Sequence, residues 1–204
     1  TYGLLHGLHQ AGHELTLLSF SDSNGTSYID TPLETFCTQI ETVSTPNRTK
    51  NDRLRDLFLS TQPDIARRLY SQTFETRLKT LVTNSQFDLI QFEGIEVACY
   101  LPVIRQMGTK AKLVYDAFNA EAAMQYAIFE IDRGNPRRWP AAVYSLVQSR
   151  RISKFEDELC QQADLVIAVS VEDASLLQRH NPKNTIPVVA NGIFTDEYEK
   201  QSSG

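Results

Sequence analysis

Acidic and amide side chains follow two short apolar runs of the sequence, and such side chains can orient a ligand through hydrogen bonds. Residues 87–92 (FDLIQF) lead directly into Glu93 and Gly94, and residues 112–115 lead into Asp-Ala-Phe-Asn-Ala-Glu. Short apolar runs of this kind are typical of buried strands. In folds built from parallel strands, ligands bind in the crevice at the carboxyl ends of the strands. The position of Glu93 therefore predicts that its carboxylate lies in such a crevice.

A third element of the same kind lies near the end of the chain. Residues 158–192 indicate the end of a helix, a buried strand at 165–169, a short helix that Ser170 opens, a turn at Asn181-Pro182 and a second strand that ends at Asn191-Gly192. This order is the building block of a doubly wound parallel sheet. We therefore predict an α/β fold, a Rossmann-like parallel sheet with helices on both faces, and place Ser170 near the crevice.

Two motifs resemble one enzyme family. The run ADLVIAVSVED, followed about twenty residues later by a strand and Asn191-Gly192, resembles the end of the N-terminal domain of family-four retaining glycosyltransferases, which have the GT-B fold. YDAFNAE resembles the family pattern Asp-x-x-Asn-x-Glu. The resemblance implies that Asn119 and Glu121 lie on the acceptor side of the interdomain cleft, and that Gln91 and Glu93 stand at a strand end where histidines are more usual.

The resemblance also implies a domain layout. A helix at 2–10, Gly12 and a strand at 14–20 match the first helix and second strand of the family, so the first strand and its glycine-rich loop are missing before Tyr2. We interpret residues 1–193 as the acceptor-side half of a GT-B fold and 194–204 as the start of an interdomain linker or a tail, with Asn191-Gly192 as the hinge. Either the chain is a fragment, which we favour, or another segment or chain supplies the strand.

The expected function is acceptor binding in a retaining transferase that moves a hexose from a nucleotide sugar to a glycan or a lipid-linked acceptor. The missing C-terminal domain would bind most of the nucleotide-sugar donor, so we expect the 204-residue chain alone to be inactive and assign no catalytic residue, cofactor or metal site. The alternative is a non-catalytic Rossmann-like module that binds a nucleotide, a sugar or a protein partner. No G-x-G-x-x-G follows any predicted strand, which argues weakly against this alternative.

Several of these side chains also have structural interpretations. Asn119 and Glu121 could cap a helix that starts at Ala120, and Ser170 with Asp173 forms a capping pattern. Asn191-Gly192 is first of all a turn that requires a positive φ at glycine. Arg151 falls on the apolar stripe of a predicted helix, where it reaches either an anion in the cleft or, by extending its stem, water.

The composition limits the kinds of binding partner and the cellular compartment that we expect. A net charge of −5 gives no reason to expect nucleic acid, and three cysteines without paired spacing indicate a reducing compartment. No apolar run approaches the roughly 20 residues that span a bilayer, and the first residues lack the pattern of a signal peptide. We therefore expect a cytoplasmic protein. The group Arg133, Arg137, Arg138 and Trp139 leaves open a peripheral contact at the inner face of a membrane.

The remaining pattern predicts mostly helices. We expect a polar loop at 21–32, a weaker strand at 36–43, helices over 51–84 in two pieces divided at Gln62-Pro63, and a helix over 95–107. Residues 122–162 are predicted to form two helices separated at 134–136, where a proline starts the second one.

Overall fold

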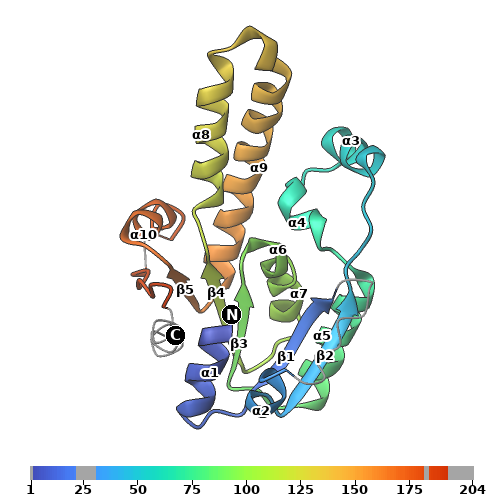
Figure 1. Ribbon diagram of the computed structural model, residues 1–204, viewed down its shortest axis with the longest axis vertical. Helices are drawn as coiled ribbons and strands as arrows, with labels where there is room; N and C mark the ends of the chain where they lie inside the picture. Colours follow the sequence, from blue (N-terminus) through green and yellow to red (C-terminus); the bar gives the residue numbers. More distant parts are fainter. Residues whose placement is uncertain (1, 22–30, 182–183, 193–204) are drawn as a thin grey trace, which may run out of the picture. The chain divides into compact units, whose positions relative to one another are not determined.

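The computed structural model describes residues 2–21, 31–181 and 184–192 (Figure 1). The chain divides into two compact units, one formed by residues 1–45 and 191–204 and the other by residues 46–190. Most of the predicted loop at 21–32, the proline of the predicted turn at 181–182, and the predicted linker or tail lie outside the described residues.

The first unit contains a helix and a parallel strand pair. α1 (Tyr2–Gln10) ends before Gly12, whose φ of 85° confirms the predicted glycine stop. β1 (Thr16–Ser21) pairs in parallel with β2 (Gln39–Ser44). The predicted strand at 36–43 is wrong at its start, because Phe36 ends the short helix α2 (Leu33–Phe36). Its ring stacks on His6 of α1 with ring centroids 4.9 Å apart, so this apolar side chain packs on a helix.

The second unit holds the elements that matter for the candidate site. They are α3 (Lys50–Leu59), α4 (Asp64–Arg68), α5 (Gln72–Asn84), β3 (Leu89–Glu93), α6 (Ile95–Ala98), α7 (Leu101–Gln106), β4 (Lys112–Ala117), α8 (Glu121–Arg133), a 3-10 turn η1 (Pro136–Arg138), α9 (Trp139–Gln162), β5 (Leu165–Ala168) and α10 (Val171–Leu177). No helix in the described part of the chain is long and apolar enough to cross a bilayer.

Two of the predicted helices are interrupted at positions where the sequence predicts a continuous helix. The break near Pro63 is confirmed, but a second break at 69–71 separates α4 from α5, and α6 is separated from α7 at Cys99-Tyr100. Tyr100 stabilises the break at 69–71, because its buried hydroxyl donates to the carbonyl of Leu69 (2.7 Å) and accepts from the N–H of Ser71 (2.7 Å). Backbone groups that a continuous helix would pair internally are thus satisfied by one side chain. The break before α7 coincides with Pro102 in the first turn of that helix, and proline has no N–H to donate to a preceding turn.

β3, β4 and β5 form a parallel sheet with β4 in the middle, which confirms the predicted α/β class. Leu113, Val114 and Tyr115 are all buried, and because consecutive strand residues point to opposite faces, both faces of β4 are covered. Asp164 fixes the start of β5, since its carboxylate accepts from the N–H of Leu113 (2.8 Å) and from the guanidinium of Arg105 (2.7 Å).

The strand predicted to end at Asn191-Gly192 is wrong. Only one isolated bridge, between Ala168 and Val188, links this segment to β5. Two backbone hydrogen bonds surround it, from Ala168 to the carbonyl of Pro187 and from Val189 to the carbonyl of Ala168. Pro187 has no N–H to donate, which limits how far a ladder can extend.

α8 and α9 run side by side as a hairpin that extends past the ends of β3, β4 and β5 (Figure 1). Asn135 caps the connecting turn by accepting from the N–H of Arg137 (3.1 Å). Within the hairpin, Gln125 donates to the hydroxyl of Ser145 (3.0 Å). The predicted pair of helices with a proline start is confirmed, with one turn of 3-10 helix before α9.

Candidate functional site

The carboxyl ends of β3 and β4 bring two acidic side chains together. Glu93 and Asp116 are register partners on neighbouring strands. Gln91 stands two residues before Glu93, on the same face of the strand, and its amide nitrogen donates to Glu93 Oε1 (2.7 Å) and to Asp116 Oδ2 (2.9 Å). One amide thus bridges two carboxylates, and we call these three residues the acidic bridge.

The acidic bridge changes the ionisation of Asp116. The pKa of Asp116 is raised to about 6, first by burial and then by the neighbouring Glu93, while the hydrogen bond from Gln91 acts in the opposite direction. A carboxyl group with this pKa is mostly ionised at neutral pH and takes up a proton in mild acid. It is therefore suited to accept a hydrogen bond, or a proton, from a hydroxyl group placed beside it.

Gly94 lets the chain turn sharply after β3. Its φ of 81° and ψ of 161° lie in a region that residues with a side chain rarely adopt, and its N–H donates to the carbonyl of Asp116 (2.8 Å). A Cβ at this position would lie 3.3 Å from ring carbons of Phe118 and 3.3 Å from Glu96 Oε2. A glycine is therefore needed to hold the two strand ends this close.

The start of α8 presents Asn119 and Glu121 next to β4. The predicted capping role of Asn119 is wrong, because Ala120 occupies the N-cap position and makes no side-chain capping bond. Instead, the amide of Asn119 donates to Glu121 Oε1 (3.1 Å). Burial raises the pKa of Glu121 against that hydrogen bond, and the charges of Glu96 and Asp173 act in the same direction as burial.

The N–H groups at the start of α8 are satisfied by carboxylates from two other helices. Asp173 of α10 accepts from the N–H of Ala120 (2.9 Å), and Glu156 of α9 accepts from the N–H of Glu121 (2.7 Å) and of Ala122 (3.3 Å to Oε2). A carboxylate at a helix N-terminus also interacts favourably with the helix dipole. The orientation of this turn therefore depends on side chains distant in the sequence.

Ser170 opens α10, as the capping interpretation predicted. Its hydroxyl accepts from the N–H of Asp173 (3.0 Å) and donates to Asp173 Oδ2 (2.5 Å). The other oxygen of Asp173 holds Ala120, so Ser170 acts on the start of α8 through one intermediate side chain. The end of β5 is in this way tied to the end of β4.

Glu156 is the most deeply buried carboxylate of this region, with 1% of its surface exposed. Burial raises its pKa to about 7, and the charges of Glu121 and Asp157 add to the effect, although the two N–H donors oppose it. His180 lies beside it, with Nε2 3.6 Å from Glu156 Oε2 and Nδ1 2.9 Å from Asp157 Oδ1. The end of α10 is thereby held against α9.

Arg151 contacts a different part of the second unit from the acidic side chains described above. Its guanidinium donates to the carbonyls of Leu57 (2.8 Å) and Asp56 (3.5 Å) near the end of α3. Carbonyl groups at a helix C-terminus lack partners within the helix, so a cation suits this place. The partner that an arginine on an apolar stripe requires is thus a helix end, and contact with an anionic ligand stays a prediction.

The predicted hinge falls at a structural boundary. The second unit ends at Ala190, directly before Asn191. Both Asn191 and Gly192 are exposed. The expected positive φ at Gly192 is wrong, because the φ of Gly192 lies outside the left-handed region. Among the described glycines, Gly12, Gly94 and Gly108 have a positive φ.

Sequence reasoning missed three contributions to this site. Asp116 belongs to the Asp-x-x-Asn-x-Glu pattern, but its pairing with Glu93 depends on strand register, which neither strand reveals alone. Glu156 gave no local signal, since it stands 35 residues from Glu121 along the chain. Asp173 fits a local capping pattern with Ser170, and that pattern gives no sign of its second contact, with the N–H of Ala120. Within the described residues, no group of three or more His, Cys, Asp and Glu side chains is arranged to hold a metal ion.

The parallel sheet with polar groups along one edge defines an α/β domain of the Rossmann-like class, and comparison with protein families specifies it further. The family model described as Glycosyltransferase Family 4 matches residues 1–197. The chain belongs to glycosyltransferase family 4, so its fold is the N-terminal half of a GT-B fold. Comparison with curated proteins and with solved structures finds no match.

The strained turn at Gly94 makes a stability prediction. Gly94→Ala should lower the free energy of unfolding by roughly 2 kcal/mol, because alanine is strained at this φ and its Cβ crowds Phe118. Gly134→Ala is the matched control, since Gly134 has φ −70° and meets only one carbonyl, at 3.6 Å. It should change stability by less than about 0.5 kcal/mol. Equal effects of the two substitutions in urea unfolding would contradict the role of Gly94.

The raised pKa of Glu156 predicts a pH-dependent stability. Since the folded pKa of about 7 exceeds the ordinary value of about 4.3, this group's contribution is complete in acid and is lost as pH rises through 7. Glu156→Gln keeps an acceptor oxygen but cannot ionise, so its stability relative to wild type should increase between pH 4.5 and 7.5, by an amount on the order of 3 kcal/mol.

Urea unfolding at several pH values measures this difference, with Glu158→Gln on the same helix as the control. The groups that titrate away from Glu156, including Asp116, are common to all three proteins and cancel in the comparison. A Glu156→Gln protein whose stability follows the wild-type pH profile would show that Glu156 is not held with a raised pKa.

Proposed function

We propose that this chain is the acceptor-binding half of a retaining transferase that moves a hexose from a nucleotide sugar to a hydroxyl group of a glycan or a lipid-linked acceptor. The observation that supports it best is the acidic bridge at the carboxyl edge of β3 and β4 in a chain of glycosyltransferase family 4. Carboxylates accept hydrogen bonds from hydroxyl groups, and ligands of such sheets bind at this edge.

The role we assign to these side chains is positioning. Glu93 and Asp116 would accept hydrogen bonds from acceptor hydroxyls, while the amide of Asn119 and the carboxylate of Glu121 contact the next part of the sugar. Holding the reacting hydroxyl in one orientation lowers the entropy cost of the transfer step. Asp116, whose pKa is raised to about 6, is still mostly ionised at neutral pH and can therefore accept hydrogen bonds from hydroxyl groups.

The negative charge at the carboxyl ends of β3 and β4 fits a donor diphosphate that binds to a second domain. Glu93, Glu96, Asp116 and Glu121 all belong to this edge, and Arg68 pairs with Glu96 at 3.5 Å. An edge of this charge disfavours a diphosphate. The donor diphosphate would therefore bind mainly to a C-terminal domain, reached through a hinge at Asn191-Gly192 and a linker from residue 194.

The strand arrangement supports the proposed domain layout. Among the described residues, β3 pairs with β4 on one side only, and β1 pairs only with β2. Parallel strands are ordinarily covered and paired on both sides. We propose that a further strand, from another segment or from another chain, pairs with the unpaired side of β1 or of β3. The three cysteines are free thiols, which fits the reducing, cytoplasmic setting that we propose.

The proposal that the donor binds to a separate C-terminal domain makes a first functional prediction. The purified 204-residue chain should neither hydrolyse nor transfer sugar from a panel of UDP-, GDP-, ADP- and TDP-linked hexoses. Release of nucleoside diphosphate, followed by chromatography, measures this directly. Turnover by the pure chain would contradict the assignment of the donor site to another domain.

The acidic bridge makes a second prediction, for the enzyme that contains both domains. Glu93→Gln should raise the KM for the acceptor and lower kcat/KM by roughly 10–100-fold, because a hydrogen bond to a charged group is lost, while donor binding stays unchanged. Glu34→Gln, on an exposed helix of the first unit, is the control and should leave both constants unchanged. Unchanged acceptor kinetics in Glu93→Gln would remove this residue from the acceptor site.

A further inference from the structure

Phe118 is a large apolar side chain that is exposed at the same edge of the sheet as the acidic bridge. It follows the last residue of β4, two residues after Asp116 and directly before Asn119, and 40% of its surface is exposed. Single exposed apolar side chains are common on proteins and need no explanation by themselves. The groups that surround this ring distinguish it from the other exposed apolar side chains.

The ring of Phe118 lies against the backbone of Gly94. A Cβ on Gly94 would lie 3.3 Å from two carbons of the ring, Cδ2 and Cε2, so the ring edge uses the space that a side chain would otherwise fill. The N–H of Gly94 donates to the carbonyl of Asp116 (2.8 Å). The ring therefore reaches from the end of β4 to the end of β3, and the turn that holds the two strand ends together also positions the ring.

Carboxylates and an amide surround the ring of Phe118. Glu96 Oε2 lies 3.3 Å from the same Cβ position as the ring carbons, so this carboxylate stands beside the ring. The acidic bridge includes Asp116, two residues before the ring, and the hydrogen-bonded pair of Asn119 and Glu121 follows it. A carboxylate can accept roughly four hydrogen bonds, more than the amide donors at this edge supply. Further donors, such as hydroxyl groups, can therefore bind around the ring.

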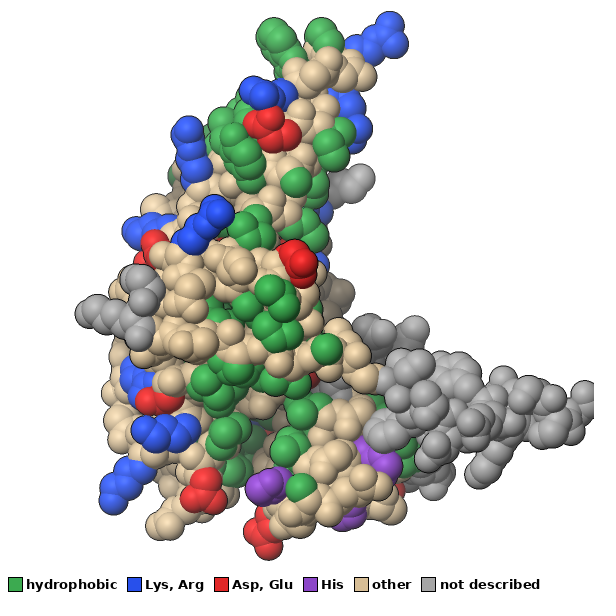
Figure 2. Space-filling view, turned by 90° about the vertical axis from the view of Figure 1, so that its left-hand side faces the viewer, with side chains coloured by type: hydrophobic (Ala, Val, Ile, Leu, Met, Phe, Trp, Pro, Cys, Tyr) green, Lys and Arg blue, Asp and Glu red, His purple; other side chains and the backbone are tan. Residues whose placement is uncertain are grey.

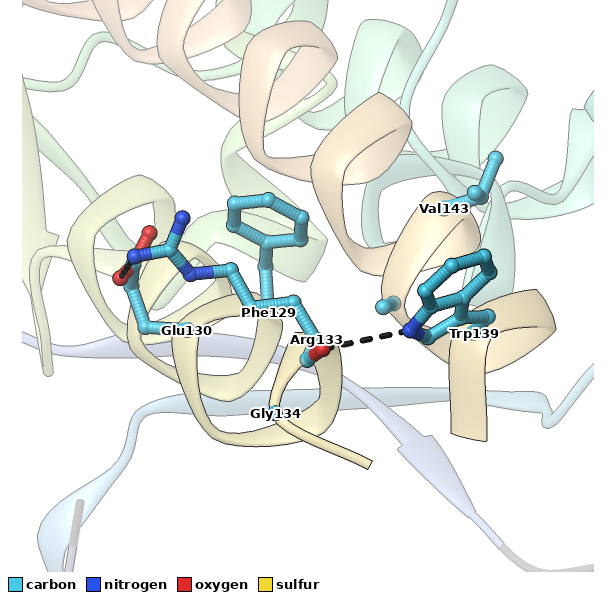
Figure 3. Close-up of a pocket in the computed structure, with 7 residues that line it drawn as sticks. Phe129, Glu130, Arg133, Gly134, Trp139 and Val143 are labelled. Carbon is cyan, nitrogen blue, oxygen red and sulfur yellow. Dashed lines mark hydrogen bonds and ion pairs between the residues drawn. The ribbon is translucent and has the colours of Figure 1, made fainter. Parts of the chain in front are cut away.

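The exposed apolar side chains of the α8–α9 hairpin have different surroundings. Figure 2 shows hydrophobic side chains over the upper part of the view, where the hairpin lies, and an open hollow of about 650 Å³ lies between its two helices (Figure 3). Arg133 and Glu130 of this hollow pair with each other at 2.7 Å, and the indole N–H of Trp139 donates to the carbonyl of Arg133 (3.3 Å). These polar groups are satisfied by one another, unlike the several carboxylates around Phe118.

An aromatic face beside hydrogen-bond acceptors matches the two kinds of surface on a pyranose ring. The hydroxyl groups of a pyranose project from its rim, whereas its C–H groups form less polar faces. The face of an aromatic ring is negatively polarised and attracts the partly positive hydrogens of C–H groups. Carboxylates accept hydrogen bonds from the hydroxyl groups at the rim. An aliphatic side chain would supply apolar area but not this flat, polarised face.

We propose that Phe118 is the aromatic ring on which the acceptor sugar stacks, with a C–H face of a neutral pyranose on the ring and its hydroxyl groups directed to the acidic bridge. This inference rests on the proposed function and specifies its substrate. The group that binds at this edge is a sugar ring without a negative charge, because the carboxylates around the ring repel an anion. An acceptor whose reacting group is a phosphate is disfavoured for the same reason.

Proton NMR with simple sugars tests the proposal on the 204-residue chain. The probes are the methyl glycosides of glucose, galactose, mannose and N-acetylglucosamine. The ring current of an aromatic side chain shifts protons that lie over its face upfield. We therefore expect at least one glycoside to show upfield shifts confined to the C–H protons of one face. Methyl glucuronide, which carries a carboxylate, should bind roughly tenfold more weakly than that neutral glycoside.

Two substitutions separate the aromatic face of Phe118 from its apolar volume. Phe118→Leu keeps an apolar side chain but removes the face, so binding should weaken roughly tenfold and the upfield shifts should disappear. Phe118→Tyr keeps the face and should bind within about threefold of wild type. Phe58→Leu is the matched control on α3, where Phe58 is 76% exposed, and should leave both binding and shifts unchanged.

The variants also distinguish failure of this inference from failure of the proposed function. Sugar binding that Asp116→Asn abolishes but Phe118→Leu leaves unchanged would keep the acceptor site at the acidic bridge and exclude Phe118 as its stacking surface. Equal loss of the shifts in Phe58→Leu would show that the effect is not specific to Phe118. If wild type shifts the signals of none of the neutral glycosides, both the stacking surface and an acceptor site at this edge are wrong.

Discussion

Three consecutive backbone N–H groups, those of residues 120–122, depend on carboxylates from elsewhere in the chain, and the candidate site depends on them. The chain leaves β4 at this point and starts α8, where helix N–H groups have no partner within the helix. Asp173 and Glu156 supply the acceptors. Because unpaired buried N–H groups cost about 1–3 kcal/mol each, removing either carboxylate should release this turn. The orientation of Asn119 and Glu121 follows from that constraint.

The same arrangement concentrates negative charge at one edge of the sheet. Glu93 and Asp116 face each other across neighbouring strands, and the pKa of Asp116 rises to about 6 through burial and this proximity. A site of this kind attracts hydroxyl groups and repels phosphates. In a chain of glycosyltransferase family 4, this charge fits an acceptor half that leaves the diphosphate of the donor to its partner domain.

The strands and the positions of the site residues could be predicted from local pattern. Short apolar runs identified β3, β4 and β5, and the residues that follow them, Glu93 and Ser170, lie at the sheet edge as expected. The features that could not be predicted depend on contacts between residues far apart in the sequence. Glu156 gives no local signal because its partner lies 35 residues away, and the helix break at 69–71 depends on the hydroxyl of a distant buried tyrosine, Tyr100. The strand register that pairs Asp116 with Glu93 likewise cannot be predicted from the sequence of either strand alone.

The most direct test of the central claim is binding of the full chain to an array of immobilised neutral and anionic glycans. The account predicts that wild type retains a defined set of neutral glycans and that Asp116→Asn loses them, because the acidic bridge supplies acceptors for their hydroxyls. Preference for anionic glycans, or equal retention by wild type and Asp116→Asn, would contradict an acceptor site at this edge.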